Sequence, residues 1–76
     1  MKNFIEYLLI RLVDHPEDLV VEEESTNEGL LIRIRVHNDD MGRVIGRSGN
    51  VIKAVRKLVQ VKAAKDDLQV KVVLDE

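Results

Sequence analysis

The stretch that decides the fold spans residues 41–49 and reads Met41-Gly42-Arg43-Val44-Ile45-Gly46-Arg47-Ser48-Gly49. Its first five residues form a short apolar segment, the next four are bounded by glycines, and a helical periodicity follows from residue 50 to about residue 65. Because glycine accepts the positive φ of a tight turn, the stretch predicts two helices joined by such a turn. Asp39 or Asp40 suits the N-cap of the first helix, and Ser48 suits the N-cap of the second.

Two stretches on the N-terminal side predict a β-hairpin. Residues 19–25 and 30–37 are rich in strand formers, and the turn-prone residues 26–29 separate them. In the second stretch four apolar residues share one face, which should meet a core: Leu30, Ile32, Ile34 and Val36. Glu22 and Glu24 can pair with Arg33 and Arg35 across the hairpin, but this depends on a register that the sequence leaves open.

A helix and a strand are predicted nearer the two ends of the chain. Apolar residues at helical spacing from Ile5 to Val13 predict an amphipathic helix, which should end around residues 14–15 because Pro16 disfavours helical backbone at the residue before it. Residues 68–74 alternate in polarity and predict a last strand with one buried face. The resulting order, α-β-β-α-α-β, is that of an α+β fold. Because no internal repeat divides the sequence, one domain is expected over residues 1–76.

Three phosphate-binding glycine patterns can be compared with residues 42–49. A P-loop has four residues between its first glycine and its Gly-Lys pair, whereas Gly42 and Gly46 enclose three and Arg47 replaces the lysine. A dinucleotide-binding fingerprint has G-x-G-x-x-G between a strand and a helix, and its spacing also differs from the one here. The remaining pattern is the G-x-x-G turn of KH domains, which lies between two helices and clamps the backbone of about four nucleotides.

The two residues between the turn glycines have the chemistry that this third pattern uses. Arg47 can make charge-assisted hydrogen bonds to phosphate oxygens, and the Ser48 hydroxyl can donate to phosphate or cap the following helix. Amides at the start of that helix also favour an anion. Since an isolated G-x-x-G is more often a plain turn, the assignment depends on the surrounding sequence.

The surrounding sequence resembles the small bacterial single-KH proteins of the KhpA type. Besides residues 41–49, the matching segments are Leu12-Val13-Asp14-His15-Pro16-Glu17-Asp18 and Ile52-Lys53-Ala54-Val55-Arg56. The resemblance implies a type II KH domain: a three-stranded mixed sheet with helices on one face, its last strand parallel to the middle one. It implies a core motif at about residues 30–75. It also implies single-stranded RNA bound at turn 46–49, with about four unpaired bases in an adjacent groove.

Matched position by position, the resemblance assigns a role to several residues around the turn. Gly46 and Gly49 become the turn glycines, and Arg43 and Lys53 flank the path of the RNA. The phosphate-facing pair is Arg47 and Ser48. Three apolar positions match the groove, although some of them can serve the core instead: Val44, Ile45 and Ile52. The family commonly has a lysine in the middle pair, and an arginine there retains the cation while changing its geometry.

Charge is strongly segregated along the chain. The net charge is -2, yet residues 41–65 contain seven basic residues and no acidic one, leaving five basic against 14 acidic residues elsewhere. Because charges act over roughly 8 Å at physiological salt, one basic face can attract phosphates while the rest repels them. Such a run is also typical of a solvated helix face.

Aromatic residues are scarce and lie in one place. Phe4 and Tyr7 both fall in the first predicted helix, so aromatic stacking platforms for bases are not expected. Recognition should therefore have low sequence specificity, as suits an RNA chaperone or a post-transcriptional regulator.

The helix after the turn carries apolar residues beyond the arc that one sheet should cover: Ala54, Leu58 and Val61. Either the sheet and the first helix cover this arc, or it is a partner surface. The resemblance favours dimerisation, with a second copy or with a larger KhpB-type RNA-binding protein. A protein-interaction adaptor that acts through this arc is therefore the alternative to RNA binding.

Composition argues against several other classes of function. There is no cysteine, and no apolar run approaches the roughly 20 residues of a membrane span. The first residues do not resemble a signal peptide, so a cytoplasmic protein is expected. His15 and His37 lack the close spacing typical of zinc sites, so no metal is expected. The carboxylate pairs fall at predicted caps and turns, and neither catalysis nor a cofactor is expected.

Overall fold

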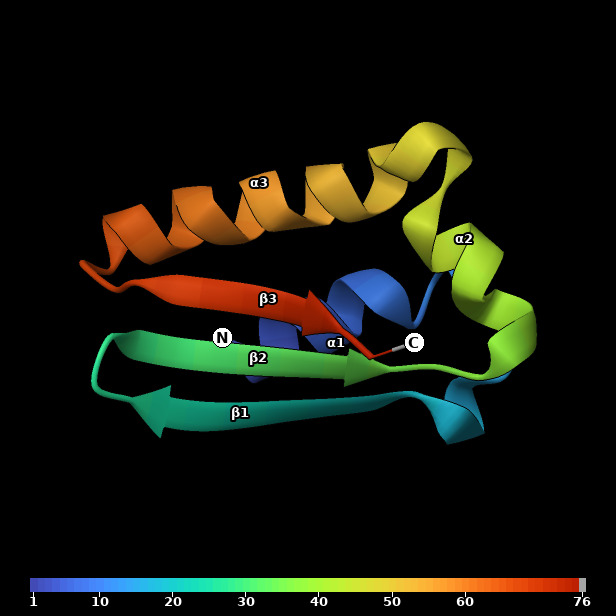
Figure 1. Ribbon diagram of the computed structural model, residues 1–76, viewed down its shortest axis with the longest axis horizontal. Helices are drawn as coiled ribbons and strands as arrows, with labels where there is room; N and C mark the ends of the chain where they lie inside the picture. Colours follow the sequence, from blue (N-terminus) through green and yellow to red (C-terminus); the bar gives the residue numbers. More distant parts are fainter. Residues whose placement is uncertain (76) are drawn as a thin grey trace.

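The computed structural model of the chain describes residues 1–75, and its α-helices and strands follow the order α-β-β-α-α-β (Figure 1). The α-helices are α1 (Lys2–Leu9), α2 (Met41–Ile45) and α3 (Asn50–Lys65), and the strands are β1 (Val20–Thr26), β2 (Gly29–Arg35) and β3 (Val70–Leu74). Short 3-10 turns lie at η1 (Pro16–Asp18), η2 (Asn38–Asp40) and η3 (Arg47–Gly49). The expected α+β fold is confirmed, and the strand ends differ from the predicted ones by one or two residues.

The sheet has the order β1-β2-β3, with β2 antiparallel to β1 and parallel to β3. In Figure 1 the arrows of β2 and β3 point the same way and that of β1 points the opposite way. The predicted hairpin closes through two residues, 27 and 28, where the Thr26 hydroxyl donates to the Gly29 carbonyl at 2.9 Å. The register places Glu22 opposite Arg33, and Arg35 lies diagonally within 3.3 Å of the Glu22 carboxylate.

One face of the sheet carries the hydrophobic core. The register aligns Val21 with Ile34 and Ile32 with Val72, so their side chains share that face. Helix α1 lies behind the sheet in Figure 1 and α3 runs along β3. Both helices contribute to one cluster, whose members are Ile5, Leu9, Val21, Ile32, Ile34, Val36, Val44, Ile52, Val55, Val59, Ala63, Val70 and Val72. Arg33 and Arg35 on the opposite face are exposed.

Helix α1 ends about five residues earlier than the sequence predicted. It stops at Leu9, and the chain then turns, with the amides of Leu12 and Val13 both donating to the Leu9 carbonyl. The Arg11 guanidinium donates to the Tyr7 carbonyl at 2.8 Å and so satisfies one of the free carbonyls at the helix end. Leu12 and Val13 still pack against the core from the turn, which explains why their spacing imitated a longer helix.

Asp40 is the buried polar residue that ties the segment after α1 to the start of α2. Its two carboxylate oxygens accept hydrogen bonds from the amides of Asp14, at 2.9 Å, and His15, at 3.0 Å. Asp40 is the N-cap residue of α2, one of the two residues predicted for that position, but its side chain makes no capping bond there. Burial alone would raise the pKa of Asp40. The two amides, aided by the charges of His15 and Arg43, outweigh burial and hold the pKa below 3.8.

No helix within residues 1–75 combines the length and the apolar character that crossing a lipid bilayer demands.

Replacing Asp40 with asparagine should destabilise the fold in a pH-dependent way. An amide side chain has one acceptor oxygen, and its NH2 group would face the second backbone donor. Since the pKa of Asp40 is lowered in the folded state, the stabilisation is fully present above 3.8 and is lost as pH falls through the lower folded-state value. We expect Asp40→Asn to lower the urea midpoint at neutral pH and to differ progressively less from wild type in strong acid. A difference that stays constant with pH would contradict this assignment.

Candidate nucleic-acid interface

The glycine turn reverses the chain between α2 and α3, at the yellow corner of Figure 1. Helix α2 ends where the Gly46 amide donates to the Gly42 carbonyl at 2.8 Å. Gly46 then takes φ 77° and ψ 172°, and the Gly49 amide donates back to the Gly46 carbonyl at 3.1 Å. Ser48 and Gly49 follow in left-handed conformation, with φ values of 56° and 75°. The predicted tight turn between two helices is present.

Gly46 cannot be replaced by a residue with a side chain without moving its neighbours. A Cβ atom at this position would lie 2.8 Å from the backbone nitrogen of Val51 and would overlap the Val51 side chain. The positive φ adds strain for any L-residue. In contrast, a Cβ atom on Gly42 would meet nothing within 4 Å, so the two glycines have different structural roles.

Two backbone amides of the turn are free to bind an anion. The turn's hydrogen bonds use the amides of Gly46, Gly49 and Asn50. Within residues 1–75, the amides of Arg47 and Ser48 donate to no carbonyl or side chain, and both residues are exposed. Free amides in a tight turn form an anion-binding surface.

Ser48 does not cap α3, so that expectation is wrong. Gly49 occupies the N-cap position, and no side chain makes a capping bond there. Ser48 instead holds a left-handed conformation, which costs a non-glycine residue about 1 kcal/mol or more. Among the residues that the structure describes, its hydroxyl has no hydrogen-bond partner, and it therefore remains available for a ligand.

The cations near the turn fall into two groups. Arg43 is held by the Asp14 carboxylate at 2.9 Å, and Lys62 lies 4.0 Å from Asp66. The other five basic residues of 41–65 are exposed and have no ion-pair partner within the described part of the chain: Arg47, Lys53, Arg56, Lys57 and Lys65. The Cε atom of Lys53 lies 3.9 Å from the position that a Cβ atom on Gly49 would occupy, so Lys53 adjoins the turn.

The apolar residues assigned to a groove divide between core and surface. Val44 is fully buried and Ile52 is 7% exposed, and both belong to the core cluster, so Val44 cannot touch a base. Ile45 is half-buried and remains accessible beside the turn. One surface cavity lies at the hairpin end of the sheet, beside residues 69–71, and another lies beside α1. Neither of these two cavities adjoins the turn.

The apolar arc of α3, defined as Ala54, Leu58 and Val61, is not covered by the sheet or by α1. All three residues are exposed, with Leu58 at 49% and Val61 at 70%. The interpretation in which the sheet and the first helix cover this arc is therefore wrong. The core side of α3 consists instead of Ile52, Val55, Val59 and Ala63.

Comparison of the sequence with known proteins identifies the family of the chain. The family described as KhpA/KhpB, KH domain, matches residues 2–74. The chain belongs to this family. The RNA-binding protein KhpA of Halalkalibacterium halodurans is 42% identical over 71 residues, which is 93% of each chain. That of Listeria monocytogenes is 40% identical over 76 residues, the whole of both chains, and that of Clostridium perfringens is 39% identical over 70 residues, 92% and 93% of the two chains.

Membership of the KhpA/KhpB family confirms the resemblance first seen in residues 12–18 and 41–56. The mixed three-stranded sheet and the helices on its core face agree with a KH domain.

Sequence reasoning did not detect one cluster of polar side chains in this KhpA/KhpB chain. His15, His37 and Asp39 come together at the end of the sheet near α2, although their spacing in the sequence gave no sign of it.

Replacement by alanine should have opposite effects on stability at Gly42, within α2, and at Gly46, where the turn begins. Gly46→Ala should lower the free energy of unfolding by about 2 kcal/mol or more, because it combines positive φ with a clash against Val51. Gly42→Ala is the matched control and should be neutral or stabilising by up to about 1 kcal/mol, since alanine loses less backbone entropy than glycine when the helix forms. Urea unfolding measures both. Equal effects of the two changes would contradict the described turn geometry.

Proposed function

We propose that this chain binds single-stranded RNA through the turn at residues 46–49. The observation that carries the proposal is an exposed turn in which the amides of Arg47 and Ser48 are free and the Arg47 guanidinium has no ion-pair partner among the described residues. The printed names of the relatives, each an RNA-binding protein KhpA, support RNA as the ligand. A KH turn of this type holds the backbone of about four nucleotides.

The proposed contacts follow from the groups that the turn exposes. A phosphate placed against the turn accepts from the two free amides, and the Ser48 hydroxyl donates to it. Arg47 can add two parallel charge-assisted bonds, which fix the phosphate in orientation as well as in place. Lys53, beside Gly49, supplies a further positive charge to the adjacent phosphate. Gly49, where a Cβ atom would meet only Lys53, lets the sugar-phosphate chain approach the backbone closely, whereas Gly46 makes room for Val51.

Arg43 reaches RNA only if its ion pair with Asp14 opens. Both partners are more than half exposed, so the pair contributes at most about 1 kcal/mol to stability. A phosphate can compete for a guanidinium held this weakly. We therefore assign Arg43 a secondary contact, and Arg47 and Lys53 the primary ones.

Base recognition in this proposal is weak. Ile45 and Val51 are half-buried apolar residues beside the turn, and the two aromatic residues lie in α1. Affinity then comes mainly from phosphates, which makes binding salt-dependent and tolerant of sequence. Such a protein suits a cytoplasmic RNA chaperone or post-transcriptional regulator.

Reversing the charge of the turn should strongly weaken RNA binding. We expect the double variant Arg47→Asp, Ser48→Asp to bind a short unstructured RNA oligonucleotide at least about tenfold more weakly, because the phosphate would face two carboxylates. The negative slope of log K against log salt should decrease in magnitude by about 0.7 for each phosphate that the variant no longer neutralises. Fluorescence anisotropy measures both quantities. Aspartate tolerates the left-handed conformation of position 48, so the variant should stay folded.

Lys71→Asp is the control for this experiment, since it reverses a charge on an exposed residue of the sheet. It should lower affinity much less than the turn variant. If the folded turn variant bound RNA as tightly as wild type, the turn would have no part in the mechanism.

We propose as a second candidate that the apolar arc of α3 is a partner surface. Leu58 and Val61 are exposed on the same helix that follows the turn, and about one turn of helix separates them. The partner is a second copy of the chain or a larger KhpB-type RNA-binding protein. Two joined chains would present two glycine turns to RNA, so binding of one strand by both would gain avidity.

A charge in the apolar arc should weaken this association. We expect Val61→Asp to raise the dissociation constant of a dimer at least about tenfold, because a carboxylate would be buried against apolar surface. Ile10→Asp, at an exposed apolar residue that follows α1, is the control and should have little effect. Sedimentation velocity over a concentration series measures the association. A wild-type chain that stays monomeric and recovers no KhpB-type partner would contradict this second candidate.

A further inference from the structure

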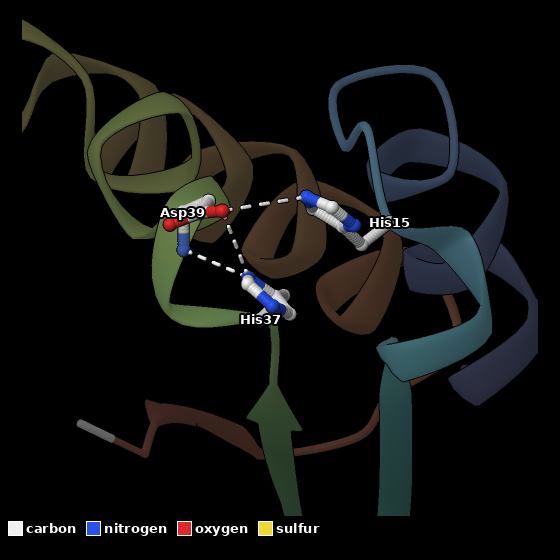
Figure 2. A group of neighbouring side chains, drawn as sticks. All are labelled: His15, His37 and Asp39. Carbon is white, nitrogen blue, oxygen red and sulfur yellow. Dashed lines mark hydrogen bonds and ion pairs between the residues drawn. The ribbon is translucent and has the colours of Figure 1, made fainter.

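Three side chains from separate segments meet beside the start of α2 (Figure 2). His15 lies in the connection between α1 and β1, His37 follows β2, and Asp39 lies in η2. The two imidazole rings stack with their centroids 4.0 Å apart. One oxygen of Asp39, Oδ2, lies 3.6 Å from Nε2 of His15 and 3.6 Å from Nδ1 of His37.

One hydrogen bond in the cluster shows which nitrogen of His37 carries a lone pair. The Asp39 amide donates to Nδ1 of His37 at 3.0 Å, so this nitrogen is unprotonated in the conformation described. The outer nitrogen of each ring faces another carboxylate: Nδ1 of His15 lies 3.5 Å from Glu17, and Nε2 of His37 lies 4.0 Å from Asp18. A proton on each outer nitrogen leaves the inner nitrogens as acceptors. Two ring nitrogens and a carboxylate oxygen, all acceptors, then face one another.

We propose that His15, His37 and Asp39 form a binding site for a divalent transition-metal ion, with zinc as the representative ion. Metal–ligand bonds of about 2.0–2.2 Å in tetrahedral geometry place ligand atoms about 3.3–3.5 Å apart. The two separations of 3.6 Å from Asp39 need only a few tenths of an ångström of adjustment, and the ligand atoms of all three residues lie within 4.8 Å of one another. Imidazole donors select zinc, nickel and copper over magnesium and calcium.

The outer carboxylates strengthen this assignment. Histidines that bind metals generally donate their other ring N–H to a carboxylate or carbonyl, which fixes the tautomer and orients the ring. Glu17 and Asp18 occupy these positions beside His15 and His37. Water would complete the coordination, because the two histidine side chains are 35% exposed and Asp39 is 73% exposed.

Metal binding has a structural cost at one position. The ion must displace the Asp39 amide from Nδ1 of His37, and the stacked rings must rotate out of their nearly parallel arrangement so that the in-plane lone pairs of both nitrogens point at one centre. The exposed amide can then bind water. The ion would join the connection before β1 to η2, and so would stabilise the folded chain increasingly as its concentration rises.

Thermal unfolding of the full chain tests the site. The protein is first treated with a chelator, and unfolding is then followed with increasing zinc chloride and, separately, with magnesium chloride. Saturating zinc should raise the Tm by about 4 °C or more, and magnesium should not. Proton resonances of both imidazole rings should shift together on addition of zinc.

Variants distinguish this site from unspecific zinc binding. Asp39→Asn preserves the shape of an exposed side chain and removes the anionic ligand, so it should lose most of the zinc-dependent Tm shift. His37→Gln should lose it as well. Glu28→Gln, at the distant hairpin, is the matched control and should keep the full shift.

Two results would overturn the proposal. One is that zinc changes neither the Tm nor the histidine resonances between about pH 6 and 8. The cluster would then bind protons in place of metal ions. The other is a zinc response of unchanged size in both Asp39→Asn and His37→Gln, which would place the metal elsewhere on the chain. Because the cluster is separate from residues 46–49, either result leaves the RNA proposal standing.

Discussion

The carboxylate of Asp40 is the contact on which the arrangement around α2 depends. Its two oxygens bind the amides of Asp14 and His15, which belong to a segment far away in the sequence. This contact places the segment after α1 against η2, immediately before α2 begins. It also brings Asp14 to Arg43 and His15 to His37. Because α2 is short, the position of its first residue also sets the position of the glycine turn that ends it.

Features that depend on local sequence were predictable, and those that depend on contacts between distant residues were not. Alternation in residues 30–36 predicted the central strand, and the glycines at 46 and 49 predicted the turn. The end of α1 was missed because Leu12 and Val13 bury their side chains without being helical. The family resemblance supplied the parallel pairing of β2 and β3, which no local pattern encodes.

The same distinction between local and long-range features applies to the candidate site. Exposure of the turn agrees with the sequence interpretation, but burial of Val44 and the ion pair of Arg43 required coordinates. Ser48 illustrates how a residue type can mislead: serine often caps helices, yet here its left-handed backbone leaves Gly49 at the cap position. The histidine cluster was missed because spacing in the sequence detects only sites built from one segment.

Charge is arranged so that a net negative protein can bind an anion at one place. The unpaired cations of α3 and the turn are exposed, whereas Arg35 on the sheet is shared between Glu22 at 3.3 Å and Asp75 at 3.7 Å. The open face of the sheet also exposes Arg33 and Lys71, but Glu22 and Glu24 of β1 share that face with them. An approaching polyanion is repelled by much of the surface and attracted over a small part, which orients it before contact.

The parallel pairing of β3 with the central strand also affects biosynthesis. Leu30 is opposite Val70, so the sheet joins segments that leave the ribosome at different times. When only the hairpin, α2 and α3 have emerged from the ribosome, the core of the nascent chain still lacks Val70 and Val72. Apolar residues such as Ile32 then stay accessible until the last strand emerges. The nascent domain is therefore open to chaperones and proteases until β3 has emerged and can close the core.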